Sequence, residues 1–329
     1  MSTRLIHQAS ELQEQVRVAR MYYLEEQSKS DIAKTLGISR FKVARILAQA
    51  REDGVVSITI KDMAPINWEL SRQLANHWNI KALVTDSERG TQAEVRKAVG
   101  RATAGVLVES LQQGEILGLA WGRTLTVMTE YLSKLPHISV VQLTGSVTSD
   151  LTESPVELVR KTSLNMGAEA FPIIAPLVLG DEQAVSALKC HPQVKVAFEL
   201  FDDITTAVLA VGSWDPPVSQ LLPAMAEEDR EALIGLGVRA EVAGIFVNDE
   251  GDILGDEFSS KCLSISASQV QAIPRVIAAA GGTVKVDALR AVVRSGLVTE
   301  IVTEHTLAKA ALELPPITPR GNPARKPMA

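Results

Sequence analysis

The chain has 329 residues, of which 46% are hydrophobic, 22% are charged and only 4% are aromatic. This composition is typical of an ordinary soluble globular protein. The length predicts two domains, and the scarcity of aromatic residues predicts a core of Val, Leu, Ile and Ala. Because the formal net charge is −6, any basic surface must be a local feature.

Several classes are disfavoured by particular residues. Cys190 and Cys262 cannot form a disulfide framework, and the Cys190–His191 pair has no second pair to complete a metal site. We therefore expect no metal and no cofactor. Residues 1–15 lack a hydrophobic signal core, and no apolar run reaches the length of a membrane span. We expect a cytoplasmic chain with no membrane partner.

The first predicted element is a helix over residues 11–26. Its apolar residues recur at steps of three and four, which predicts one inward face. That face is formed by Leu12, Val16, Ala19, Tyr23 and Leu24. We expect this helix to pack beneath the segment that follows it.

Residues 28–51 predict two helices joined by a tight turn. Ile32, Ala33 and Leu36 fall on one face of the first helix, and Gly37 follows where a turn needs a residue without Cβ strain. Ser39 is a good N-cap for the second helix. The buried side of that helix is expected to consist of Phe41, Val43, Ala44, Ile46 and Leu47.

Basic residues gather on this second helix. Between Ser39 and Arg51 there are four basic residues and no acidic one. Residues 1–62 carry 10 Lys and Arg against 8 Asp and Glu, a net charge of +2, so the remaining residues carry −8. Arg40, Lys42 and Arg45 are expected to point outward near the N-terminal half, the part of a recognition helix that reaches base edges.

The pattern indicates that residues 1–62 form a helix-turn-helix domain that binds double-stranded operator DNA. The alternative is a helical hairpin with a solvated basic face. The turn glycine, the N-cap, the apolar Ile38 expected to pack into the corner and the clustered positive charge coincide, which favours the DNA-binding interpretation. The residues expected at the DNA are Ser39, Arg40, Phe41, Lys42 and Arg45.

After a short strand over residues 55–60 and a domain boundary at 61–66, strands and helices alternate. Strands without polar alternation are typical of a parallel sheet covered by helices, so residues 66–314 predict a doubly wound α/β domain. Residues 244–258 predict a β-hairpin, and the proline-rich residues 315–329 predict a disordered tail. The predicted strands are 80–86, 115–120, 138–144, 170–179 and 205–213, and the predicted helices are 92–112, 123–135, 155–167 and 230–237.

Ligands of a doubly wound sheet bind at the carboxyl ends of its strands, where three segments are candidates. Residues 118–124 run from a strand through Gly122 to a helix that starts near Thr124, and could hold an anion or simply form an ordinary turn. Residues 143–146 are a second exit of this kind. In residues 281–285, Lys285 follows a glycine pair and could reach an anion as a point charge or remain solvated.

The chain resembles bacterial sugar-responsive transcriptional regulators of the SorC family. The resemblance covers nearly all of it and rests on three stretches. They are VRVARMYYLEEQSKSDIAKTLGISRFKVARILAQAREDGVVSITI, the AWGRTL motif, and the C-terminal half with RAEVAGIFVNDEGDI and IPRVIAAAGGTVKVDALRAVVRSGLVTEIVTEHTLAKAAL.

The family resemblance implies a Rossmann-like effector domain similar to phosphosugar isomerases, a sugar or sugar-phosphate effector, and a tetramer of two dimers. It implies that Gly122 and Thr124 bind the effector's phosphate, that Glu241 accepts hydrogen bonds from sugar hydroxyls, and that Lys285 contacts the ligand from the far side. Two departures matter. Arg123 stands where small residues also occur, and Phe41–Arg45 is less polar than in many members.

The sequence therefore predicts a non-enzymatic regulator of carbohydrate metabolism whose operator binding is controlled by a metabolite, with no catalytic residue. The alternative is an isomerase-type enzyme with an accessory DNA-binding domain, although the carboxylates and histidines form no obvious acid–base pair. A third possibility is a vestigial effector site in an assembly module. We expect a homo-oligomer of even order, a dimer or a tetramer, with residues 301–314 as one candidate contact.

Overall fold

The computed structural model describes residues 3–56, 64–87, 90–132, 136–147 and 153–321. The chain divides into two compact units, Met1–Asp62 and Met63–Ala329. In the described part of both units, no helix is long and apolar enough to cross a membrane.

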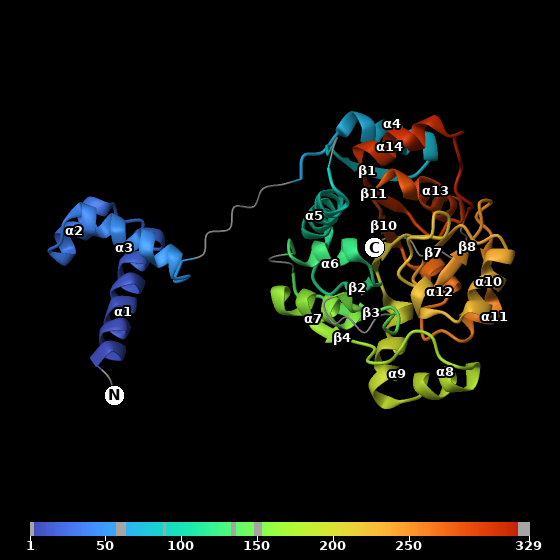
Figure 1. Cartoon of the computed structure of the whole chain (residues 1–329), viewed down its shortest axis with the longest axis horizontal. Coiled ribbons are helices and arrows are strands. Elements are labelled where there is room, and N and C mark those ends of the chain that lie inside the picture. Colours follow the sequence, from blue (N-terminus) through green and yellow to red (C-terminus); the bar gives the residue numbers. More distant parts are fainter. Residues whose placement is uncertain (1–2, 57–63, 88–89, 133–135, 148–152, 322–329) are drawn as a thin grey trace. The chain divides into compact units, whose positions relative to one another are not determined.

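The described residues of the N-terminal unit form three helices, α1 (Thr3–Tyr23), α2 (Lys29–Leu36) and α3 (Arg40–Glu52) (Figure 1). Gly37 ends α2 with a φ of +64°, a left-handed conformation that glycine adopts without Cβ strain. The Ser39 hydroxyl accepts a hydrogen bond from the Lys42 N–H at 3.1 Å and so caps α3. The predicted turn and N-cap are confirmed.

The predicted inward face of the first helix is confirmed at Ala19, which is buried, and at Tyr23, which packs against the core, but is wrong at its other three residues. Leu12, Val16 and Leu24 are exposed, and Leu24 lies beyond the end of α1. The helix instead buries a neighbouring stripe that packs on α2 and α3, because its rotation is set by the helices it contacts and not by its own periodicity. The buried residues of this stripe are Gln15, Val18, Ala19 and Met21.

Phe41 is a second correction. It was expected in the core but is 88% exposed. Val43, Ile46, Leu47 and Ala50 follow the three- and four-residue spacing that fills the core. Phe41 lies two residues before Val43, so at about 100° per residue its side chain leaves the helix on the opposite side.

The C-terminal unit is built on a parallel sheet of seven strands, which confirms the α/β fold class (Figure 1). Every pairing in this sheet is parallel. In spatial order the strands are β1 (Lys81–Thr85), β11 (Glu300–Glu304), β10 (Arg275–Ala279), β5 (Thr206–Ala210), β2 (Ile116–Leu119), β3 (Ser139–Gln142) and β4 (Glu169–Phe171).

Helices cover both faces of this sheet (Figure 1). One face packs on α5 (Gln92–Ser110), α6 (Arg123–Thr129) and α7 (Pro155–Met166), and the other on α4 (Trp68–Trp78), α13 (Val286–Arg294) and α14 (His305–Glu313). Within β5, Val208 faces the first layer while Ala207 and Leu209 face the second. Burial on both faces explains why the strands are continuously apolar.

A smaller antiparallel sheet contains β6 (Gly212–Ser213), β7 (Ala240–Val242), β8 (Ile245–Val247) and β9 (Ile253–Leu254). Its β8–β9 pair confirms the predicted hairpin. The helices that accompany this sheet and the loops of the unit are α8 (Glu182–Lys189), α9 (Pro192–Glu199), α10 (Glu227–Gly235), α11 (Asp256–Ser259) and α12 (Ala267–Ala272).

Several predicted boundaries are wrong. The expected strand 170–179 is regular only over β4, and α6, expected to reach residue 135, ends at Thr129. The strand expected at 55–60 falls largely outside the described residues. Disorder from Pro315 is wrong for residues 315–321, because Ile317 is buried and Arg320 forms an ion pair with Asp252 at 2.6 Å.

The C-terminal segment 301–314, which was expected to contact another copy of the chain, is not one continuous helix. Residues 301–304 belong to β11 in the interior of the sheet. The helix that follows, α14, directs Leu307, Ala308 and Ala311 into the core. That face is therefore occupied within the chain and cannot serve as the contact between copies.

Two glycines test this packing in opposite directions. A Cβ on Gly145 would overlap the Pro176 carbonyl, whereas a Cβ on Gly105, inside α5, would meet open space. We expect Gly145→Ala to lower the free energy of unfolding by about 1–3 kcal/mol. Gly105→Ala should raise it by about 0.5–1 kcal/mol because alanine favours the helix. Urea unfolding measures both, and equal effects would contradict the packing described.

Candidate functional site

A cavity of about 370 Å³ lies at the carboxyl ends of β2, β5 and β10. β2 and β5 are neighbours in the sheet. β3, which follows β2 in the chain, lies on the outer side of β2, whereas β10 and β11, which follow β5 in this sheet, lie on the other side of β5. This is the topological switch point, where the loops diverge and leave a crevice for a ligand.

The loop after β2 forms one wall of the pocket. Gly122 has a φ of +148°, and a Cβ there would overlap the Cβ of Ala210, so only glycine fits between the two strand exits. Thr124 is buried in α6, while the Arg123 guanidinium donates to the Val218 carbonyl at 3.3 Å. Because α6 has only seven residues, its dipole contributes little to anion binding.

Lys285 enters from the loop after β10. The buried Glu304 carboxylate accepts a hydrogen bond from the Gly282 N–H at 3.2 Å, which fixes this loop against β11. The Lys285 ammonium donates to the Val211 carbonyl at 2.7 Å. Burial, together with the nearby positive charges of Arg123 and Arg96, lowers the pKa of Lys285 to about 8 against the attraction of Glu241.

Glu241 comes from β7 of the antiparallel sheet and pairs with Gly212 of β6. A Cβ on Gly212 would overlap the Glu241 carboxylate, so this glycine makes room for it. The carboxylate accepts hydrogen bonds from the Ser219 hydroxyl at 2.8 Å and the Gly244 N–H at 3.4 Å. Burial nevertheless raises the pKa of Glu241 to about 7.

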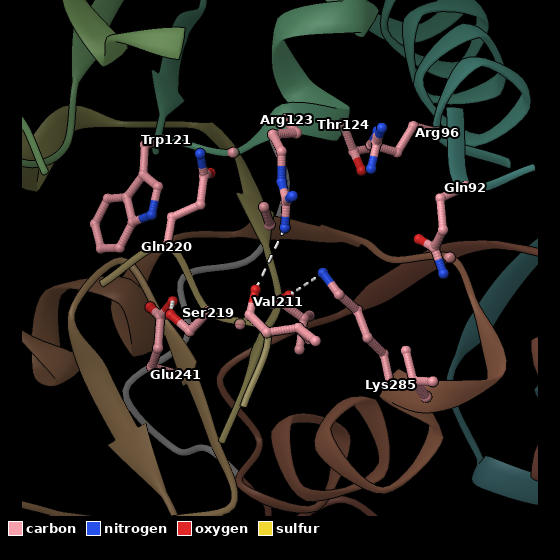
Figure 2. A pocket seen from close by; sticks show the side chains of 16 residues that line it. Gln92, Arg96, Trp121, Arg123, Thr124, Val211, Ser219, Gln220, Glu241 and Lys285 are labelled. Carbon is pink, nitrogen blue, oxygen red and sulfur yellow. Dashed lines mark hydrogen bonds between the residues drawn. The ribbon is translucent and has the colours of Figure 1, made fainter. Parts of the chain in front are cut away.

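The structure brings together all five residues predicted for the effector. Gly122, Arg123, Thr124, Glu241 and Lys285 line the same cavity. Figure 2 shows the Arg123 and Lys285 side chains reaching toward its middle from opposite sides, and Glu241 on the far side of Val211 from Gln92.

The candidate exit at residues 143–146 is not part of the pocket. Its backbone is bonded to other segments, with the Gly145 N–H donating to Leu263 and the Ser146 N–H to Ala175. Among the described residues, no group of three His, Cys, Asp or Glu could hold a metal ion.

Sequence reasoning missed several lining residues, most importantly a polar pair on α5. Gln92 and Arg96 lie one turn apart near the N-terminus of this helix, which follows β1 (Figure 2). Their four-residue spacing at the start of a helix was an available signal. Ser219 and Gln220 carried no such signal because they lie in an irregular segment.

The residues predicted at the DNA have different environments on α3. Arg40 and Arg45 are exposed, as expected. Lys42 is half-buried and forms an ion pair with Glu14 of α1 at 3.5 Å. Ser39 is committed to the cap of the helix.

Comparison with known proteins agrees with this architecture. The family model described as "Putative sugar-binding domain" matches residues 66–313. The erythritol catabolism regulatory protein EryD of Brucella abortus is 25% identical over 305 residues, covering 91% of this chain and 96% of that protein. The transcriptional regulator LsrR of an Enterobacter species is 26% identical over 310 residues, covering 91% and 92%.

A solved structure has the same fold. The full-length sorbitol operon regulator SorC from Klebsiella pneumoniae superposes with a TM-score of 0.68 at 22% identity, covering 92% of this chain and 99% of that one. The family match spans the sheet-containing unit, and relatives that match nearly the full length are named regulators. The protein is therefore a transcriptional regulator with a sugar-binding domain. It belongs to the SorC family.

The buried carboxyl makes folding stability depend on pH. The folded-state pKa of Glu241, about 7, lies above its ordinary value of 4.5, so the folded chain binds more protons between these values. Its contribution to stability is complete below pH 4.5 and is lost as the pH rises through 7. We expect Glu241→Gln to remove roughly 3 kcal/mol of this loss, as measured by urea unfolding from pH 4.5 to 7.5. Parallel pH curves for the two proteins would contradict the shift.

Proposed function

We propose that the pocket binds a phosphorylated, sugar-derived metabolite and that this binding controls how the α2–α3 helix-turn-helix holds operator DNA. The observation that carries the proposal is the charge of the pocket. Among the described residues that line this small cavity, Arg96, Arg123 and Lys285 are basic and Glu241 is the one carboxylate.

Three cations in a confined space repel one another. Burial is the main cause of the lowered pKa of Lys285, and the charges of Arg123 and Arg96 add to it. A phosphate in the cavity would offset the repulsion and accept several charge-assisted hydrogen bonds. The Gly122–Thr124 turn would supply backbone donors beside it. Glu241 would accept hydrogen bonds from the hydroxyls of the sugar, because its carboxylate already lies in a polar network with Ser219.

Binding can change operator affinity only through a difference in ligand affinity between two states of the protein. The named functions of the relatives support the regulatory role. Operator binding places the protein in the cytoplasm, and two half-sites require an even number of copies, so a dimer or tetramer belongs to this proposal.

We propose that the metabolite is bound and not turned over. Glu241 and Lys285 both titrate near neutral pH, as an acid–base pair would. Their polar atoms are held by Ser219, Gly244 and Val211, which suits recognition more than proton transfer. Isomerisation of sugar phosphates by the purified protein would contradict this and favour the isomerase-type alternative.

The effector site is tested by calorimetric titration with sugar phosphates, polyol phosphates and the unphosphorylated sugars. Lys285→Ala removes a charged hydrogen-bond donor and should lower the affinity for the metabolite roughly ten- to hundredfold. Its affinity for operator in the absence of metabolite should be unchanged. Lys309→Ala, on the exposed side of α14, is the matched control. If the wild type and Lys285→Ala bind the metabolite with equal affinity, the ligand site lies elsewhere. If unphosphorylated sugars bind as tightly as their phosphates, the proposal that the pocket recognises an anionic group is contradicted.

The DNA contact is tested through Arg45. Arg45→Ala should weaken specific operator binding by about 1–3 kcal/mol if its guanidinium contacts a base, and binding to all sequences uniformly if it contacts phosphate. Lys195→Ala removes a positive charge from α9, in the other unit, and is the control. It should change neither specific operator binding nor binding to other sequences. Unchanged operator affinity in gel-shift titrations of both Arg40→Ala and Arg45→Ala would exclude α3 as the reading helix.

A further inference from the structure

The outward face of α3 carries an apolar group that the fold itself does not use. Phe41 is 88% exposed and lies in the first turn of the helix. Arg45 and Ala48 are also exposed, and their spacing of four and seven residues from Phe41 places all three on one stripe. The residues that hold α3 in its own core, Val43, Ile46, Leu47 and Ala50, leave the helix elsewhere.

An aromatic side chain left in water gives up the free energy that its burial would provide. Other large apolar side chains of the unit, such as Leu24, are also exposed, but they do not lie on the helix proposed to enter the groove. Phe41 lies between Arg40 and Arg45, in a stretch without acidic residues. This pattern suits a polyanion as the surface that covers it. A second copy of the same face would bring like charges together.

The major groove offers one apolar group to such a side chain. Thymine presents its C5-methyl group there, whereas the other three bases present no methyl group. The first turn of a recognition helix is the part that reaches base edges. Arg45, one turn further along the same stripe, is placed to donate to a neighbouring base or phosphate.

We propose that Phe41 determines operator specificity by packing on a thymine methyl group in each half-site. This inference rests on the proposed DNA binding by α3. It goes beyond charge attraction, because an uncharged ring adds sequence preference without adding phosphate contacts.

The test starts from a randomised pool of duplex DNA, from which the full-length wild-type protein selects its sites. The most enriched site is then synthesised with deoxyuridine in place of each thymidine in turn, a change that removes only the methyl group. Binding is measured for the wild type, Phe41→Ala and Phe41→Leu. Leu24→Ala, another exposed apolar truncation in the same unit, is the control.

At one thymine of each half-site we expect deoxyuridine to weaken wild-type binding about fourfold, the effect of one buried methyl-sized group. Phe41→Ala should be insensitive to that replacement, Phe41→Leu should retain part of the sensitivity, and Leu24→Ala should behave as wild type. Salt dependence should be unchanged in Phe41→Ala because no charge is lost.

Two results would overturn the inference while leaving DNA binding intact. One is a deoxyuridine effect of equal size in the wild type and Phe41→Ala. The other is an altered oligomeric state of Phe41→Ala with an unaltered sequence preference, which would assign Phe41 to a protein contact. Failure of the wild type to enrich any sequence would instead contradict the proposed function itself.

Discussion

The pocket depends on the burial of two opposite charges that are held by different partners. Lys285 donates to the Val211 carbonyl, and Glu241 accepts from Ser219 and Gly244. A buried charge is costly unless it is hydrogen-bonded, so the loops that supply these partners must keep their positions. Gly122 and Gly212 are required for the same reason, because a side chain at either position would overlap the groups that form the walls.

These constraints explain why the pocket suits recognition of a polar anion. The parallel sheet brings the exits of β2, β5 and β10 to one edge, and the antiparallel sheet adds Glu241 from another direction. Basic groups therefore meet the Glu241 carboxylate across a cavity of about 370 Å³. A ligand with a phosphate at one end and hydroxyls at the other matches this distribution of charge.

The position of the pocket could be predicted from the sequence, because strand exits of a parallel sheet must meet at one edge. That rule placed Gly122, Thr124 and Lys285 close together, and turn and capping preferences identified Gly37 and Ser39. The exposure of Phe41 and the inward face of α1 were missed, because helix rotation is decided by tertiary contacts. Arg96 was missed although its spacing from Gln92 at the start of α5 was a signal, and Ser219 was missed because it lies in an irregular segment. The order of residues 315–321 depends on Arg320 reaching Asp252.

In the proposed function, the pocket and α3 are thermodynamically coupled. The most direct test of this coupling is to titrate the identified sugar phosphate into the full-length protein with and without saturating operator duplex. Linkage requires the two effects to be equal. The factor by which saturating operator changes the affinity for the metabolite must be the factor by which saturating metabolite changes the affinity for operator. We expect the two factors to match and both to be smaller in Lys285→Ala. Identical metabolite affinity with and without operator would contradict the coupling.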